Sequence, residues 1–147
     1  MAAILRPEAT PEDFSRRAEG FLPGWFGMKV TAITPGRLEM ELPIKQEMLA
    51  PNGFLHAASI VALADTAAGF ATIAHLPEGS ESFTTIELKA NYFKPVWKGL
   101  LRATGKVVKR SRTLGYIECE VVDAGGSLVC KLASTCMVLR EQAAAGR

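Results

Sequence analysis

An apolar stretch of 18 residues, from Ala57 to Ala74, constrains the fold of this chain more than any other feature. It contains no proline and has the length of five helical turns, so it predicts a helix. A helix that is apolar on almost every side is typical of a protein core or of a membrane span. One carboxylate, Asp65, lies in its middle and would be costly in lipid. We therefore predict a helix buried inside a folded domain.

The remaining sequence predicts one further helix and six strands. Thr10 precedes Pro11, a pattern typical of a helix N-terminus, and predicts a helix over 11–20. Alternating apolar and polar residues predict strands over 28–34, 37–44, 83–93, 100–110, 114–123 and 127–139. We expect residues 1–147 to form one α+β domain, in which a curved antiparallel β-sheet wraps around the long helix, with a flexible tail over 141–147. The edges of such a sheet predict a homo-oligomer.

The cysteine and histidine residues argue against a disulfide framework and a metal site. Cys119, Cys130 and Cys136 form no CxxC pair, so we expect reduced thiols in the core. His56 and His75 lack the cysteine or acid spacing of a zinc site, and no metal is expected. The first residues contain no apolar segment of the signal-peptide kind. Together these features predict a cytoplasmic protein.

Positive charge is concentrated in one segment, although the net charge is only +2. Eight of the 17 basic residues lie between Lys89 and Arg112, and that segment contains no acid. It predicts either a solvated strand face or a binding site for an anionic partner. No zinc-finger, helix-turn-helix or RNP pattern accompanies the charge, which argues against nucleic acid as the partner. A small polyanion fits the same charges.

Asp65 has no ion-pairing residue on its own helix, because nothing basic lies three or four positions away. It either pairs with a distant Lys or Arg or faces a cleft with a shifted pKa, and we favour the cleft. In helical projection Ser59, Thr66 and Thr72 lie near its face. Their hydroxyl groups either join a site there or bond back to the preceding turn.

The start of the long helix offers a second candidate group. His56 is the expected N-cap, and the first N–H groups of a helix have no partner within it. The N–H of Ala57 can stabilise an oxyanion, and Asp65 can act as base or nucleophile, which together suit carbonyl hydrolysis. The two residues are eight apart, about 12 Å along the axis. If both act on one carbonyl, they come from two subunits, and the site lies at a dimer interface.

The segment PNGFLHAASIVALADTAAG resembles the HGG-x(6)-D segment of hot-dog-fold acyl-CoA thioesterases. These are the group typified by the PaaI thioesterase and the Arthrobacter-type 4-hydroxybenzoyl-CoA thioesterase. The segments FTTIELKANYFKPVWKG and VVKRSRTLGYIECEVVDAGGSLVCKLASTCMVL resemble the later strands of that family. The resemblance implies a hot-dog fold and hydrolysis of an aryl- or medium-chain acyl-CoA to free acid and CoA. It implies no cofactor, since CoA is part of the substrate, and a homodimer with shared active sites that pairs into a homotetramer.

The same resemblance implies roles for individual residues. Asp65 is the expected catalytic carboxylate, the backbone N–H of Ala57 polarises the thioester carbonyl, and His56 shapes the loop and contacts the thioester. Thr85 falls where relatives have a Ser or Thr that positions water. The expected substrate-binding residues are Asn52, Gly53, Lys109, Arg110, Ser111 and Arg112, with the basic side chains holding the CoA phosphates.

Two departures from the family pattern keep other functions open. The glycines after the histidine are Ala57 and Ala58 here, although alanine keeps the N–H group. The Asn or Gln six residues before the histidine is Ala50, so Asn52 is the candidate that replaces it. One alternative is a hot-dog protein that binds an acyl-CoA without hydrolysing it. Another is a thioesterase acting on an acyl-carrier protein, which would dock on the basic segment.

Overall fold

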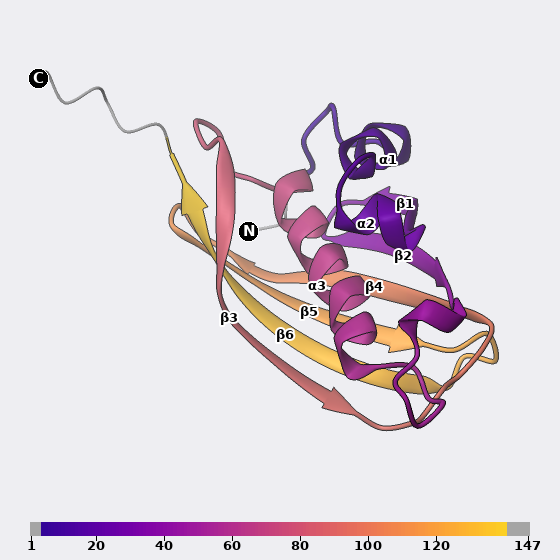
Figure 1. Ribbon diagram of the computed structural model, residues 1–147. Coiled ribbons are helices and arrows are strands. Elements are labelled where there is room, and N and C mark those ends of the chain that lie inside the picture. Colours follow the sequence, from indigo (N-terminus) through magenta and orange to yellow (C-terminus); the bar gives the residue numbers. More distant parts are fainter. Residues whose placement is uncertain (1–3, 141–147) are drawn as a thin grey trace, which may run out of the picture.

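The computed structural model describes residues 4–140 and shows an antiparallel sheet that curves around one long helix (Figure 1). The helices are α1 (Pro11–Ala18), α2 (Leu22–Phe26), the 3₁₀ turn η1 (Gln46–Met48) and α3 (Ala57–Ala74). The strands are β1 (Lys29–Thr34), β2 (Arg37–Pro43), β3 (Ser82–Tyr92), β4 (Leu100–Arg110), β5 (Leu114–Val122) and β6 (Leu128–Leu139). Their order in the sheet is β1-β2-β4-β5-β6-β3, and every neighbouring pair is antiparallel. This arrangement confirms the predicted α+β architecture.

Most predicted bounds agree with the structure, and the N-terminal helix is the main correction. The predictions over 57–74 and 100–110 have the observed bounds. The strand predicted over 83–93 is shifted by one residue at both ends, and each of the other four strands differs by one residue at one end. The helix predicted over 11–20 ends at Ala18, because Glu19 is already extended and Gly20 adopts a φ of 79°. The short helix α2 and the turn η1 were not predicted. The tail predicted over 141–147 lies outside the described residues.

The core lies between α3 and the concave face of the sheet. By length and composition α3 could cross a membrane, but 56% of it is buried inside the fold, as expected of a core helix. All three cysteines are free and buried, which confirms the prediction of reduced core thiols. The largest fully buried side chains of the sheet are Leu38, Met40, Leu42, Leu101, Ile117, Leu132, Val121, Val129 and Cys119.

Small residues allow α3 to lie close to the sheet. A Cβ atom added at Gly105 of β4 would lie 3.0 Å from the backbone oxygen of Ala67 and 3.4 Å from the methyl group of Ala71. The ring of Phe70, on another side of α3, packs against Phe14 of α1 with 4.9 Å between centroids. The helix is therefore enclosed by the sheet on one side and by α1 on another.

His75 fixes the end of α3 to the β1–β2 hairpin. Its Nε2 accepts a hydrogen bond from the N–H of Gly36 at 2.8 Å, and its Nδ1 lies 2.7 Å from the oxygen of Ala71. Since Nε2 accepts, the neutral ring carries its proton on Nδ1 and donates it to Ala71. Burial lowers the pKa of His75, which favours this neutral form. The second histidine is therefore a structural residue.

Alanine substitution at two buried glycines tests the close packing of α3 on the sheet. We expect Gly105→Ala to lower the free energy of unfolding by about 1–3 kcal/mol, because the backbone of α3 must move. Gly115→Ala is the matched control, since its Cβ would meet only the methyl group of Thr72 at 3.8 Å. The control should be neutral or stabilising by up to about 1 kcal/mol through the unfolded chain. Urea unfolding measures both, and equal stabilities would contradict the close contact.

Candidate active site

The N-terminus of α3 is fixed by His56, which is its N-cap as predicted. The Nδ1 atom of His56 accepts a hydrogen bond from the N–H of Ala58 at 2.9 Å. The carbonyl oxygen of Met48 accepts two hydrogen bonds, from the N–H of His56 at 3.0 Å and from the hydroxyl of Ser59 at 2.8 Å. Because Nδ1 is an acceptor, the neutral His56 ring carries its proton on Nε2. The exposed ring thus has a donor available for a ligand.

The N–H of Ala57 is a free donor at the positive end of the helix. His56 takes the N–H of Ala58, and the carbonyl of His56 accepts from Ser59 and Ile60. Within residues 4–140 the N–H of Ala57 has no hydrogen-bond partner, and Ala57 itself is exposed. Helix N-termini bind negative charge through such groups. This N–H can therefore act on a carbonyl oxygen.

Asn52 and Gly53 lie in the loop that leads into His56. The side-chain oxygen of Asn52 accepts from the N–H of Phe54 at 3.2 Å, and Gly53 adopts a φ of 90° that favours glycine. The N–H of Leu55 donates to the oxygen of Val96 at 2.7 Å and holds this loop against the β3–β4 connection. The loop uses the Asn52 oxygen, which leaves its NH₂ group as the donor that can reach a ligand.

Asp65 is half-buried in the middle of α3 and makes no hydrogen bond or ion pair within the part of the chain that the structure describes. Burial raises its pKa above the usual value of 3.8. No Lys or Arg of residues 4–140 forms an ion pair with Asp65, so the distant partner that the sequence left open is not found within this chain. The carboxylate remains a basic group at the protein surface.

The hydroxyl groups near Asp65 are occupied by structural hydrogen bonds. Thr66 donates to the oxygen of Ala62 at 2.6 Å, and Thr72 donates to the oxygen of Ala68 at 2.9 Å. Both therefore bond back to the preceding turn, which is one of the two outcomes expected from the sequence. Ser59 is bonded to Met48 as described above. Asp65 is the polar group of this face that is left free for chemistry.

Thr85 lies on the face of β3 that is turned toward α3. Asp65, Gly69 and Thr72 share one side of the helix. A Cβ atom at Gly69 would lie 2.9 Å from the ring of Phe83 on β3, and the Thr72 hydroxyl lies 3.6 Å from the sulfur of Cys136 on β6. Thr85 pairs with Cys136 and points to the same face of β3 as Phe83, two residues away. The sheet order thus places this half-buried threonine on the side of β3 that faces the helix on which Asp65 lies.

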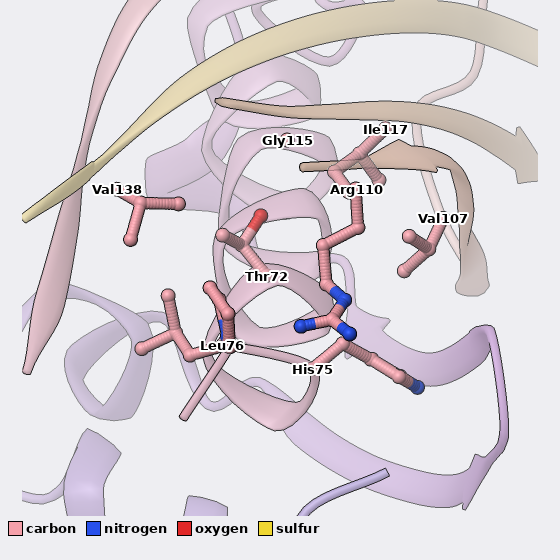
Figure 2. Close-up of a pocket in the computed structure, with 9 residues that line it drawn as sticks. Thr72, His75, Leu76, Val107, Arg110, Gly115, Ile117 and Val138 are labelled. Carbon is pink, nitrogen blue, oxygen red and sulfur yellow. The ribbon is translucent and has the colours of Figure 1, made fainter. Parts of the chain in front are cut away.

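The predicted phosphate-binding residues lie at the other end of α3. Figure 2 shows Arg110 beside Thr72, His75 and Leu76 at the C-terminal end of the helix, around a cavity of about 10 Å³. That cavity is large enough for one water molecule. It contains none of the proposed catalytic residues. Since α3 is about 27 Å long, one chain cannot place Arg110 next to the N–H of Ala57.

The turn between β4 and β5 gathers unpaired positive charge. Ser111 stabilises this turn, because its hydroxyl oxygen accepts from the N–H groups of Thr113 and Leu114 at 3.3 and 3.0 Å. Lys109, Arg110 and Arg112 form no ion pair within the described ranges. Arg140 joins them, since its guanidinium donates to the oxygen of Arg112 at 3.2 Å. The sequence analysis missed Arg140, because it is 28 positions away and no motif connects the two.

Comparison with known proteins identifies the family. Residues 52–130, just over half of the chain, match the model of the Thioesterase superfamily. The chain belongs to this superfamily. The matched segment begins at Asn52 and contains the α3 N-terminus, Asp65 and Thr85. The resemblance stated from the sequence is therefore confirmed, and thioester hydrolysis is the chemistry that this superfamily membership supports.

Individual relatives extend the likeness over most of the chain. A protein of Saccharolobus solfataricus with an esterase name is 32% identical, over 77% of this chain and 79% of its own length. The 1,4-dihydroxy-2-naphthoyl-CoA hydrolase of Escherichia coli K12 is 24% identical, over 92% of this chain and 99% of its own. The solved thioesterase HI1161 of Haemophilus influenzae has a TM-score of 0.86 at 22% identity, covering 93% of this chain and 95% of that one. The structural likeness confirms the hot-dog fold.

Replacing the free carboxylate should stabilise this thioesterase-superfamily chain at neutral pH. The folded-state pKa of Asp65 is raised above 3.8, so the folded state binds the proton more tightly and an ionised Asp65 lowers stability. We expect Asp65→Asn to raise the urea midpoint at pH 7. The gain should shrink as the pH falls from the raised pKa to below 3.8, where both states of the wild type are protonated.

Asp13→Asn is the control for that measurement, because the Asp13 carboxylate is paired with Arg17 at 2.7 Å. The Asp13→Asn protein should have no higher urea midpoint than the wild type at pH 7. An Asp65→Asn protein that is no more stable than the wild type at pH 7 would contradict a raised pKa of Asp65 in the folded state.

Proposed function

We propose that the chain hydrolyses the thioester bond of an aryl- or medium-chain acyl-CoA to a free acid and CoA. The observation that carries the proposal is the free N–H of Ala57 at the start of the helix that holds the unpaired Asp65. An aryl-CoA is supported by the name of the Escherichia coli relative, 1,4-dihydroxy-2-naphthoyl-CoA hydrolase. A cytoplasmic location is supported by the three free cysteines. The proposed reaction uses no metal or cofactor.

The proposed reaction assigns one step to each group. The N–H of Ala57 donates to the carbonyl oxygen of the thioester and stabilises the oxyanion that forms there. Asp65 removes a proton from water, and the resulting hydroxide adds to the carbonyl carbon. The intermediate then loses the CoA thiolate by cleavage of the C–S bond, and the proton held by Asp65 passes to the sulfur. Thr85 holds the water, and the Nε2–H of His56 contacts the thioester.

The proposed site needs two subunits in antiparallel arrangement. Ala57 and Asp65 of one helix are about 12 Å apart, so each must act with its counterpart from a second chain. Edge strand β3 is 11 residues long, and its exposed Ile86, Leu88 and Tyr92 favour pairing with a copy of itself. A two-fold axis near Val61 would bring Ala57 of one helix opposite Asp65 of the other. The outcome is a homodimer with two sites, which we expect to pair further into a homotetramer.

The basic turn at 109–112 fits the CoA phosphates in this dimer. Asp65 and His75 are ten residues apart, about 15 Å along α3, and Arg110 lies beside His75. An extended pantetheine arm is also about 15 Å long, since it has the length of a little over four extended residues. A CoA with its thioester at Asp65 can therefore reach Lys109, Arg110 and Arg112 of the same subunit. An acidic carrier protein fits the same charges, and turnover of one acyl group on both carriers separates the two substrates.

Proline at position 57 tests the proposed oxyanion donor. His56 has a φ of −63° and a ψ of 137°, which suits a residue before proline, and Ala57 is the first helical residue. Ala57→Pro should keep the helix and the melting temperature but lower kcat by about 10²–10³, the usual cost of one oxyanion donor. Ala57→Gly keeps the N–H and is the matched control. Thiol release from an acyl-CoA panel measures both, and a stable Ala57→Pro protein with full activity would refute the mechanism.

Mixed dimers test whether the site is shared. Asp65→Asn should lower kcat by about 10²–10⁴, as expected for the loss of a general base. Ala57→Pro inactivates the other half of each site. After subunit exchange, heterodimers of the two variants contain one intact site, so about one quarter of the wild-type activity should return. Exchange is verified with tagged subunits, and no recovery despite exchange would contradict the two-subunit site.

A further inference from the structure

A larger cavity lies directly beyond the small one at the C-terminal end of α3. Its volume is about 520 Å³, within the range of protein cavities that bind small ligands, whereas the cavity of Figure 2 has about 10 Å³. Leu76, Pro77 and Arg110 line both cavities. The larger cavity therefore begins where the proposed path of CoA along α3 reaches the basic turn.

Residues 4–8 form one wall of this cavity, and Arg6 holds them in place. The N–H of Arg6 donates to the oxygen of Ala74, the last residue of α3, at 2.9 Å. Its guanidinium donates to three carbonyl oxygens of the connection between α3 and β3, those of Leu76, Pro77 and Ser80, at 3.2, 3.3 and 2.9 Å. Since these bonds use most of its donors, Arg6 shapes the cavity and is not the cation that binds a ligand.

The half-buried Arg110 is the cation that remains available in the lining. It forms no ion pair with residues 4–140. Its charge also reaches His75, whose pKa is lowered mainly by burial and further by Arg110. Arg140 connects the basic turn to the lining, because its guanidinium donates to the oxygens of Arg112 and Glu78 at 3.2 and 3.1 Å. A guanidinium in these surroundings binds phosphate through charge-assisted hydrogen bonds.

The rest of the lining suits a nucleoside better than a bare phosphate. Five of the ten lining residues are apolar and can pack against a base: Ile4, Leu5, Pro7, Leu76 and Pro77. Two carboxylates also line the cavity. Glu8 is paired with Arg6 at 3.7 Å, while Glu78 forms no ion pair in the described part of the chain. A free carboxylate repels a bare phosphate, but it accepts a hydrogen bond from the amino group of a base.

We propose that this cavity binds the nucleotide part of CoA, an adenosine 3′,5′-bisphosphate, with a phosphate group on Arg110 and the base among the apolar residues. The inference rests on the proposed function. With the thioester at Asp65, the extended pantetheine arm of about 15 Å ends near Arg110, so the nucleotide continues into the cavity. A carrier protein presents the same arm without a nucleotide. The cavity therefore narrows the substrate class to acyl-CoA.

Removing the nucleotide from the substrate tests the inference. For one acyl group, the wild-type kcat/KM should be about 10–100-fold higher for the acyl-CoA than for the acyl-pantetheine, which ends with the arm. Arg110→Gln should remove most of this difference by raising KM for the acyl-CoA, because a phosphate contact is made in ground and transition state alike. Lys106→Gln, which removes a cation of the same strand outside the cavity, should leave the ratio unchanged.

Calorimetric titration with adenosine 3′,5′-bisphosphate measures the nucleotide site without turnover. Arg6→Gln should weaken this binding, because residues 4–8 lose the bonds that hold them against the α3–β3 connection. Arg16→Gln, a change at an exposed arginine of α1, is the matched control. Inorganic pyrophosphate should bind more weakly than the bisphosphate, since it has no base to fill the cavity. Equal affinities of the two probes would show that the base is not bound and would overturn the inference.

The outcomes separate the inference from the function on which it rests. If the wild type hydrolyses the acyl-CoA and the acyl-pantetheine equally well, or if the folded Arg110→Gln protein keeps the wild-type preference, the inference is wrong while the thioesterase function stands. Faster turnover of the acyl-carrier protein than of the acyl-CoA overturns it as well. If the wild type hydrolyses no thioester, the proposed function itself fails, and the titration alone decides on the nucleotide site.

Discussion

The contact of α3 with the concave face of the sheet is the interaction on which the rest of the structure depends. Gly105 and the alanines of the helix bring the two backbones so close that an added Cβ would lie 3.0 Å from the oxygen of Ala67. Such packing buries the apolar helix and leaves little room beneath it. A substrate cannot enter between α3 and the middle of the sheet.

The same rigid helix separates the two groups to which we assign the proposed chemistry. Its N-terminus presents an unpaired N–H at Ala57, held in place by His56 and by the carbonyl of Met48. Its middle presents a half-buried carboxylate at Asp65 whose pKa is raised by burial. An unpaired, partly desolvated acid lowers the stability of the fold, and such sites are characteristic of function. Because a helix does not bend to join the two groups, the reaction that we propose requires a second subunit.

Much of this was predictable from the sequence, because the decisive patterns are local. A run of 18 apolar residues predicted the helix, and His56 before it predicted the N-cap. The absence of a Lys or Arg three or four positions from Asp65 indicated that this acid has no ion-pair partner on its own helix. The end of α1 was predicted two residues too late, because Glu19 already has an extended backbone and the left-handed φ of Gly20 follows outside the helix. The short helix α2 was missed, since five residues carry too little periodicity to detect.

The sequence by itself determined the central helix, its N-cap and the lone carboxylate, since each depends on residues within a few positions of one another. The tertiary structure decided which groups meet across the sheet. Strand β3 lies beside β6 at the edge and not beside β4, its neighbour in sequence. This order places Phe83 against Gly69, while the basic turn lies at the C-terminal end of α3. Contacts of this kind depend on strand order and curvature, which residue periodicity does not encode.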